Sequence, residues 1–238
     1  MIVFWRLFLA WMLTDFVFSP YRMTWLRQAK RTTVMAVRAV ILALLALVFC
    51  HNYLTEAWPF LVAQITVPGW VCIIAFALFH VFAFYYFNVD GRLKYGYTLT
   101  FFLQMLVNGL FVMLISPFRV LYETGNFFAE PWVVFLAGLI VATRVIGWFI
   151  FAVEQDKYGR DYPTFDEQWL LALVRAIFFL VMLLPGVRWA VAFLVWLAAC
   201  LYARRMRLID MPSWAFYVGA FGAGFIGLLV RLRFYLVG

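Results

Sequence analysis

The chain has 238 residues, of which 68% are hydrophobic and 13% are charged, and its mean hydropathy is +0.97. Soluble globular domains carry about 45–50% apolar and about 25% charged residues, so this composition excludes a water-soluble domain and predicts a polytopic integral membrane protein. The formal net charge of +8 is explained by basic loops beside a membrane, and we expect no nucleic-acid partner.

Eight apolar segments along the chain are long enough to cross a bilayer, whose hydrocarbon core of about 30 Å needs about 20 apolar helical residues. They are 2–18, 33–50, 66–88, 96–116, 131–152, 168–184, 187–203 and 213–233. Pro185 and Gly186 mark a tight turn between the sixth and seventh segments. The sequence predicts an all-α bundle of about eight spans, in which residues 1–116 form one four-helix unit and residues 117–238 a second one.

Lysine and arginine are concentrated in alternate loops. Eleven lie after the first, third, fifth and seventh segments: Arg22, Arg27, Lys30, Arg31, Arg92, Lys94, Lys157, Arg160, Arg204, Arg205 and Arg207. Five lie on the opposite side: Arg6, Arg119, Arg188, Arg231 and Arg233. Because cytoplasmic loops carry an excess of these residues, both termini are predicted outside the cytoplasm. The longest polar stretch, "EQDKYGRDYPTFDEQ", is either a docking surface or a solvated connector.

Four ionisable residues inside the segments need an explanation, because each costs about 2.5–3.5 kcal/mol at bilayer depth on insertion scales. Asp15 and Arg38 lie near the cytoplasmic ends of the first two segments, which a short loop joins as antiparallel neighbours. We therefore expect these two side chains to form an ion pair. Arg144 and Arg175 lie near the same side and are alternative partners for the carboxylate.

A polar site around Asp15 is the functional alternative, with His80, Gln104 and Asn108 as its other members. Gln104 and Asn108 share one helix face at a spacing of four residues. A metal centre needs several His or carboxylate ligands and an open coordination position. The segments hold one carboxylate and one histidine, so we expect neither a catalytic residue nor a metal ligand. A transport or ligand pocket remains a further alternative.

The three cysteines and the glycines of the last segment have simple interpretations. Cys50, Cys72 and Cys200 have no metal-ligand spacing and are expected to be buried thiols. "GAFGAGFIG" has the GxGxxG spacing, but it lies within a continuous apolar run and not after a strand, which argues against a dinucleotide site. The small residues Gly219, Ala223 and Gly227 recur every four positions and predict close helix packing, either within the chain or against another one.

Three stretches, "LFLAWMLTDFVFSPYRMTWLRQAKR", "FALFHVFAFYYFN" and "LTFFLQMLVNGLFVML", resemble the bacterial membrane-protein family called domain of unknown function 3307. The matching residues are Asp15, Phe16, His80 and Gln104. Other polar positions of that pattern hold Trp11, Arg38, Phe84 and Leu103 in this chain. A metal or acid–base centre built from the pattern would therefore have lost most of its groups. The resemblance implies a bacterial inner-membrane scaffold and does not supply an activity.

These observations favour a non-enzymatic integral membrane subunit or scaffold of a larger membrane assembly. Its expected partners are membrane lipids and other integral membrane subunits. We expect bound lipid and no cofactor, with a pigment or quinone as an alternative suggested by the 21% aromatic content. Two other functions stay open: a small transporter or channel with a polar intramembrane site, and a degenerate metal-dependent hydrolase at Asp15 and His80.

Overall fold

The computed structural model describes residues 2–18, 31–60, 62–87, 96–117, 130–159, 165–206 and 212–236. Within these ranges the chain divides into two compact units, unit 1 (Met1–Val133) and unit 2 (Val134–Gly238). The boundary lies inside one helix, whereas the sequence analysis placed it between residues 116 and 117. Most of the basic loop residues and the centre of "EQDKYGRDYPTFDEQ" lie outside the described residues.

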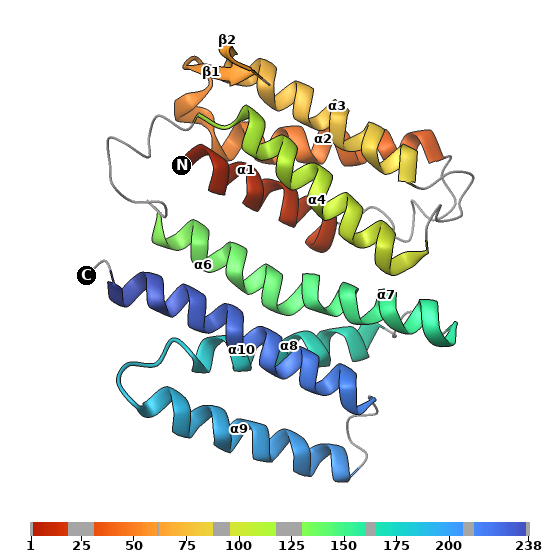
Figure 1. Cartoon of the computed structure of the whole chain (residues 1–238), viewed down its shortest axis with the longest axis vertical. Coiled ribbons are helices and arrows are strands. Elements are labelled where there is room, and N and C mark those ends of the chain that lie inside the picture. The colour runs from red at the N-terminus through yellow and green to blue at the C-terminus, as the bar shows by residue number, and fades with distance from the viewer. Residues whose placement is uncertain are drawn as a thin grey trace. The chain divides into compact units, whose positions relative to one another are not determined.

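Unit 1 is built from four helices and a small hairpin, coloured red to yellow-green in Figure 1. The helices are α1 (Ile2–Met12), which continues into the π-helical segment η1 (Leu13–Val17), α2 (Arg31–Phe49), α3 (Gly69–Phe87) and α4 (Tyr97–Ile115). Each helix packs against the next in sequence, and α1 also packs against α4. This arrangement closes a four-helix bundle whose core holds Leu7, Trp11, Leu42 and Phe76.

The hairpin of unit 1 differs from the prediction, which began the third span at residue 66. Two antiparallel strands, β1 (Ala57–Phe60) and β2 (Val62–Pro68), follow the short 3-10 helix η4 (His51–Tyr53), and α3 begins at Gly69. Ala57 pairs with Pro68 and Trp58 with Val67. The segment contains β-branched and aromatic residues and two prolines, a composition that favours strand edges over a helix interior.

Unit 2 begins in α6 (Pro131–Ile140), which runs through the π-helical segment η6 (Val141–Val145) into α7 (Ile146–Tyr158). The remaining helices, coloured teal to blue in Figure 1, are α8 (Phe165–Val181), α9 (Arg188–Arg205) and α10 (Ser213–Leu236). The predicted turn at Pro185–Gly186 is present, with Gly186 at a φ of 62°. Helix α10 packs against α8, η6 and α7, while α9 packs mainly against α8.

Five helices among the described residues are long and apolar enough to cross a membrane. They are Thr32–Phe49, Gly69–Phe87, Tyr97–Ile115, Pro131–Tyr158 and Ser213–Leu232. The stretch Gln168–Val181 of α8 is a shorter apolar helix, and α9 carries three arginines, at positions 188, 204 and 205. The predicted all-helical membrane architecture is therefore confirmed in its coarse form, but the count of eight spans is not.

Candidate functional site

Asp15 lies in the π-helical turn at the end of the first helix. The hydroxyl of the preceding residue, Thr14, donates to the carbonyl oxygen of Ala10 at 2.8 Å, a contact that competes with regular helical hydrogen bonding. Trp11, one helical turn before Asp15, donates from its indole Nε1 to Asp15 Oδ2 at 2.7 Å. Asp15 Oδ2 thus receives its hydrogen bond from a residue of the same helix.

Arg38 of α2 supplies the positive charge that the sequence analysis expected beside Asp15. Its Nη2 lies 2.6 Å from Asp15 Oδ1, and its Nε donates to the same oxygen at 3.1 Å. Both side chains are at least nine-tenths buried. The guanidinium also lies over the ring of Phe84 in α3, with 4.3 Å between Cζ and the ring centroid. This cation–π contact replaces some of the hydration that the guanidinium loses.

His80 of α3 extends the ion pair toward the fourth helix. Its Nε2 lies 3.0 Å from Asp15 Oδ1 and accepts a hydrogen bond from Arg38 Nε at 3.0 Å. Its Nδ1 lies 2.9 Å from Oδ1 of Asn108 in α4, and Asn108 Nδ2 donates to the Gln104 carbonyl at 2.8 Å. We call these residues the polar network: Trp11, Asp15, Arg38, His80 and Asn108. It joins all four helices of unit 1.

The polar network has the donor set of a structural ion pair and not of a metal centre. It contains one carboxylate and one imidazole, and both carboxylate oxygens already accept hydrogen bonds from protein groups. The described residues contain no group of three or more His, Cys, Asp or Glu side chains close enough to share an ion. A hydrolytic metal site needs more ligands and an open position, so the arrangement does not fit one.

Two members of the site were not among the site residues predicted from sequence. Trp11 and Phe84 occupy positions where the resembling family has polar groups, yet both contact the charged residues directly. The signal was present in the spacing, because Trp11 lies four residues before Asp15 and Phe84 four residues after His80. Gln104, which was predicted, enters the network through its backbone carbonyl.

The other two arginines that the sequence analysis placed inside apolar segments, Arg144 and Arg175, each contact a residue of unit 2. Arg144 of η6 lies with its Cζ 4.3 Å from the ring centroid of Trp169 in α8. Arg175 of α8 is 7% exposed, and its Nε donates to the carbonyl of Thr143 in η6 at 3.0 Å. Asp15 takes its guanidinium from Arg38, so neither Arg144 nor Arg175 is the partner that the alternative prediction named.

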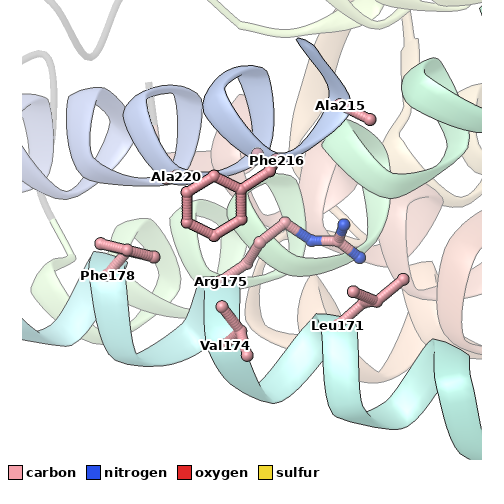
Figure 2. A pocket seen from close by; sticks show the side chains of 8 residues that line it. Leu171, Val174, Arg175, Phe178, Ala215, Phe216 and Ala220 are labelled. Carbon is pink, nitrogen blue, oxygen red and sulfur yellow. The ribbon is translucent and has the colours of Figure 1, made fainter. Parts of the chain in front are cut away.

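Figure 2 shows Arg175 in a small groove between α8 and α10, beside Phe216 and Leu171. The groove is otherwise apolar and encloses about 10 Å³, enough for about one water molecule. The guanidinium reaches α7 because Gly147 has no side chain: a Cβ there would lie 2.6 Å from Arg175 Nη2. Arg175 thus lines the groove together with apolar side chains and extends from it toward α7.

The predicted stripe Gly219, Ala223 and Gly227 is used inside unit 2. A Cβ on Gly227 would lie 2.5 Å from the Phe179 carbonyl oxygen, so α10 and α8 approach each other backbone to backbone at this point. Ala223 is fully buried, and Gly219 lies beside the stem of Arg175. The partner helix is thus α8 of the same chain, and the stripe is not evidence for a partner protein.

A second ion pair in unit 1, which the sequence analysis did not predict, joins Arg6 of α1 to Glu130. Arg6 Nε donates to Glu130 Oε2 at 2.8 Å, and its Nη2 lies 2.5 Å from Oε1. Its Nη1 donates to the carbonyl of Phe49 at the end of α2. This two-point contact closes the end of the bundle away from Asp15.

The fold and the polar network define the class of the protein: a predominantly helical protein whose described residues include five helices long and apolar enough to cross a membrane, with a buried, internally paired polar core in unit 1. Comparisons with protein-family models, with curated proteins and with solved structures find no match. The resemblance of residues 5–115 to a bacterial membrane family stays a prediction.

Proposed function

We propose that the protein is a non-enzymatic integral membrane scaffold, acting as a subunit of a larger assembly in a bacterial inner membrane. The observation that carries this proposal is the closure of the polar network, in which Asp15 is held by Trp11 and Arg38 and contacts His80. In lipid, polar groups that pair across helices hold a bundle together, since burial of apolar surface no longer drives helix association. The network acts as such a connection.

The outward surfaces of the helices fit lipids and other membrane chains as partners. Trp70, Ile74, Leu78 and Phe82 follow one face of α3 at four-residue steps, and all are exposed. On α10 the exposed residues Tyr217, Phe221, Phe225 and Leu229 repeat this spacing. Such continuous apolar stripes need a nonaqueous environment. Bound lipid is the expected occupant, and a pigment or quinone would use the same aromatic surface.

Isolation from native membranes in a mild detergent tests the subunit role. We expect a tagged form of the protein to co-purify with other membrane chains in fixed proportion after crosslinking in the membrane. The double variant Asp15→Asn/Arg38→Gln serves as a control for the role of the network, because it removes both charges together. It is expected to keep the same companions. A stable, lipid-bound monomer without companions would contradict the subunit role.

A second candidate function is a small transporter, and the two π-helical segments favour it. The first helix of each unit contains a π-helical segment with a charged residue: η1, with Asp15, at the end of the first helix of unit 1, and η6, with Arg144, between α6 and α7 in unit 2. Interrupted helices at corresponding places in two halves of a chain often mark a substrate site in transporters. Anion flux into liposomes, lost in Arg144→Ala and Arg175→Ala, would establish this function. Flux no faster than that of protein-free liposomes would reject it.

A further inference from the structure

Three atoms of the polar network form a nearly equilateral triangle inside unit 1. His80 Nε2 lies 3.0 Å from Asp15 Oδ1 and 3.0 Å from Arg38 Nε, and Arg38 Nε lies 3.1 Å from Asp15 Oδ1. Arg38 Nε carries a single hydrogen, which both other atoms face. Whether His80 Nε2 carries a hydrogen therefore decides whether it accepts a hydrogen bond from Arg38 Nε or donates one to Asp15 Oδ1.

The tautomer of His80 follows from the hydrogen bonds on its far side. Asn108 Nδ2 donates to the Gln104 carbonyl, so the amide of Asn108 presents its oxygen to the imidazole. An amide oxygen only accepts hydrogen bonds, and His80 Nδ1 must therefore carry a hydrogen. In a neutral ring Nε2 then has a free lone pair, which accepts the hydrogen bond from Arg38 Nε.

We propose that His80 is a proton-operated switch in unit 1, which holds Arg38 through Nε2 when neutral and releases that contact when Nε2 takes up a proton. The incoming proton turns Nε2 from an acceptor into a donor. Asp15 Oδ1, 3.0 Å away, then becomes the acceptor of both His80 Nε2 and Arg38 Nε. Protonation thus removes the hydrogen bond between Arg38 of α2 and His80 of α3 and adds a hydrogen bond between His80 and Asp15 of η1, while Arg38 still lies over Phe84 of α3.

The charged groups that face His80 give the network a different net charge when the ring is neutral and when it is protonated. Asp15 from η1 and Arg38 from α2 contact the ring, and from α4 the neutral Asn108 does so. The ring is 1% exposed and Asn108 is 2% exposed. With His80 neutral, the carboxylate and the guanidinium balance, and with His80 protonated the network carries one excess positive charge. The proton is therefore expected to loosen the packing of α2 against α3. This proposal depends on the geometry of unit 1 and is independent of the scaffold role.

The experiment is nitrogen NMR of the full chain in lipid nanodiscs, labelled at histidine and arginine. The chain has only two histidines, and the other, His51, is exposed, so His51→Gln leaves a single imidazole to observe. At neutral pH we expect a protonated Nδ1 and an unprotonated, hydrogen-bonded Nε2. On acidification Nε2 should become protonated, and the Arg38 Nε resonance, assigned by comparison with Arg38→Lys, should shift over the same pH interval.

Two further measurements complete the test. Asn108→Leu removes the acceptor on Nδ1 and is expected to give a mixture of both neutral tautomers. In His80→Gln the Arg38 resonance should lose its dependence on pH, while His51→Gln should keep it. A proton on Nε2 at neutral pH, a ring that stays in one protonation state over the whole range in which the protein is folded, or an Arg38 resonance that ignores the titration would each overturn the proposal.

Discussion

Asp15 illustrates how a single carboxylate is accommodated in an apolar helix. Its two oxygens are satisfied from different directions, Oδ2 by Trp11 within its own helix and Oδ1 by Arg38 from the next one. An unpaired buried charge is costly, whereas a pair with complete hydrogen bonding is tolerated. Two aromatic residues also help to stabilise the buried charges, because Trp11 donates a hydrogen bond to the carboxylate and the ring of Phe84 faces the guanidinium.

Trp11→Phe tests the contribution of the indole hydrogen bond. We expect the free energy of unfolding to fall by about 1.5–3 kcal/mol more than in Trp58→Phe, because a hydrogen bond to a charged group contributes about that much. Both tryptophans are at most 1% exposed and lose the same volume in these variants, but Trp58 Nε1 has no partner among the described residues. Unfolding of purified protein in mixed micelles measures the difference. Equal losses in the two variants would contradict the assigned role of Trp11.

At the scale of elements, the two π-helical segments are built in the same way. In η1 Thr14 donates to Ala10, four residues before it, and in η6 Thr143 donates to Leu139 at 2.6 Å. Each threonine is followed by a charged residue, and each segment receives a buried arginine from the next helix, Arg38 or Arg175. The threonine contacts compete with the regular helical hydrogen bonds. Arg175 donates to a backbone carbonyl of η6, whereas Arg38 binds the side-chain carboxylate of Asp15 in η1.

Gly227→Ala tests the backbone contact between α8 and α10. The new Cβ would meet the Phe179 carbonyl and Met182 Cβ at 2.5 and 2.9 Å, so the two helices must separate. We expect a loss of about 1–3 kcal/mol in the free energy of unfolding, as for other overpacked cores. Gly109→Ala in α4 is the matched control, because nothing lies within 4 Å of its added Cβ. It should be neutral or stabilising by up to about 1 kcal/mol. The same effect at both positions would argue against the close approach of α8 and α10.

For the whole molecule, the two units share a helical composition but differ in packing. The helices of unit 1 pack in sequence order around the polar network, while α10 of unit 2 lies against α8, η6 and α7. In unit 1 the helices are held together by the polar network. In unit 2 they are held together by close packing at small residues and by contacts of the Arg175 side chain. Both solutions replace the hydrophobic driving force that lipid removes.

The orientation of the chain in the membrane is tested with reporters fused after residue 238. The excess of lysine and arginine in alternate loops predicts a C-terminus outside the cytoplasm. An alkaline phosphatase fusion should therefore be active and a green fluorescent protein fusion dark. The same reporters fused within the loop that holds Lys94 should behave in the opposite way. A fluorescent C-terminal fusion would reverse the predicted topology.

Hydrophobic length and charge placement predict the helices well, because a helix that is buried in lipid must satisfy its backbone within itself. The pair of Asp15 and Arg38 is predictable for a related reason, since a charged side chain inside a membrane needs a partner of opposite charge. Three features needed coordinates. Strands β1 and β2 could not be predicted because their stretch is apolar but too short to span a membrane as a helix. The contact of His80 with Arg38 depends on how α3 is aligned against α2. The partner of Gly227 depends on how α10 packs on α8.

The central claim is that Asp15 and Arg38 stabilise the bundle as a pair, and a double-mutant cycle measures it most directly. Asp15→Asn and Arg38→Gln each leave one buried charge without its partner and are expected to lower the free energy of unfolding by about 3–5 kcal/mol. The double variant carries neither charge and should lose less than either single variant. Losses that simply add in the double variant, or single variants as stable as the native chain, would contradict the claim.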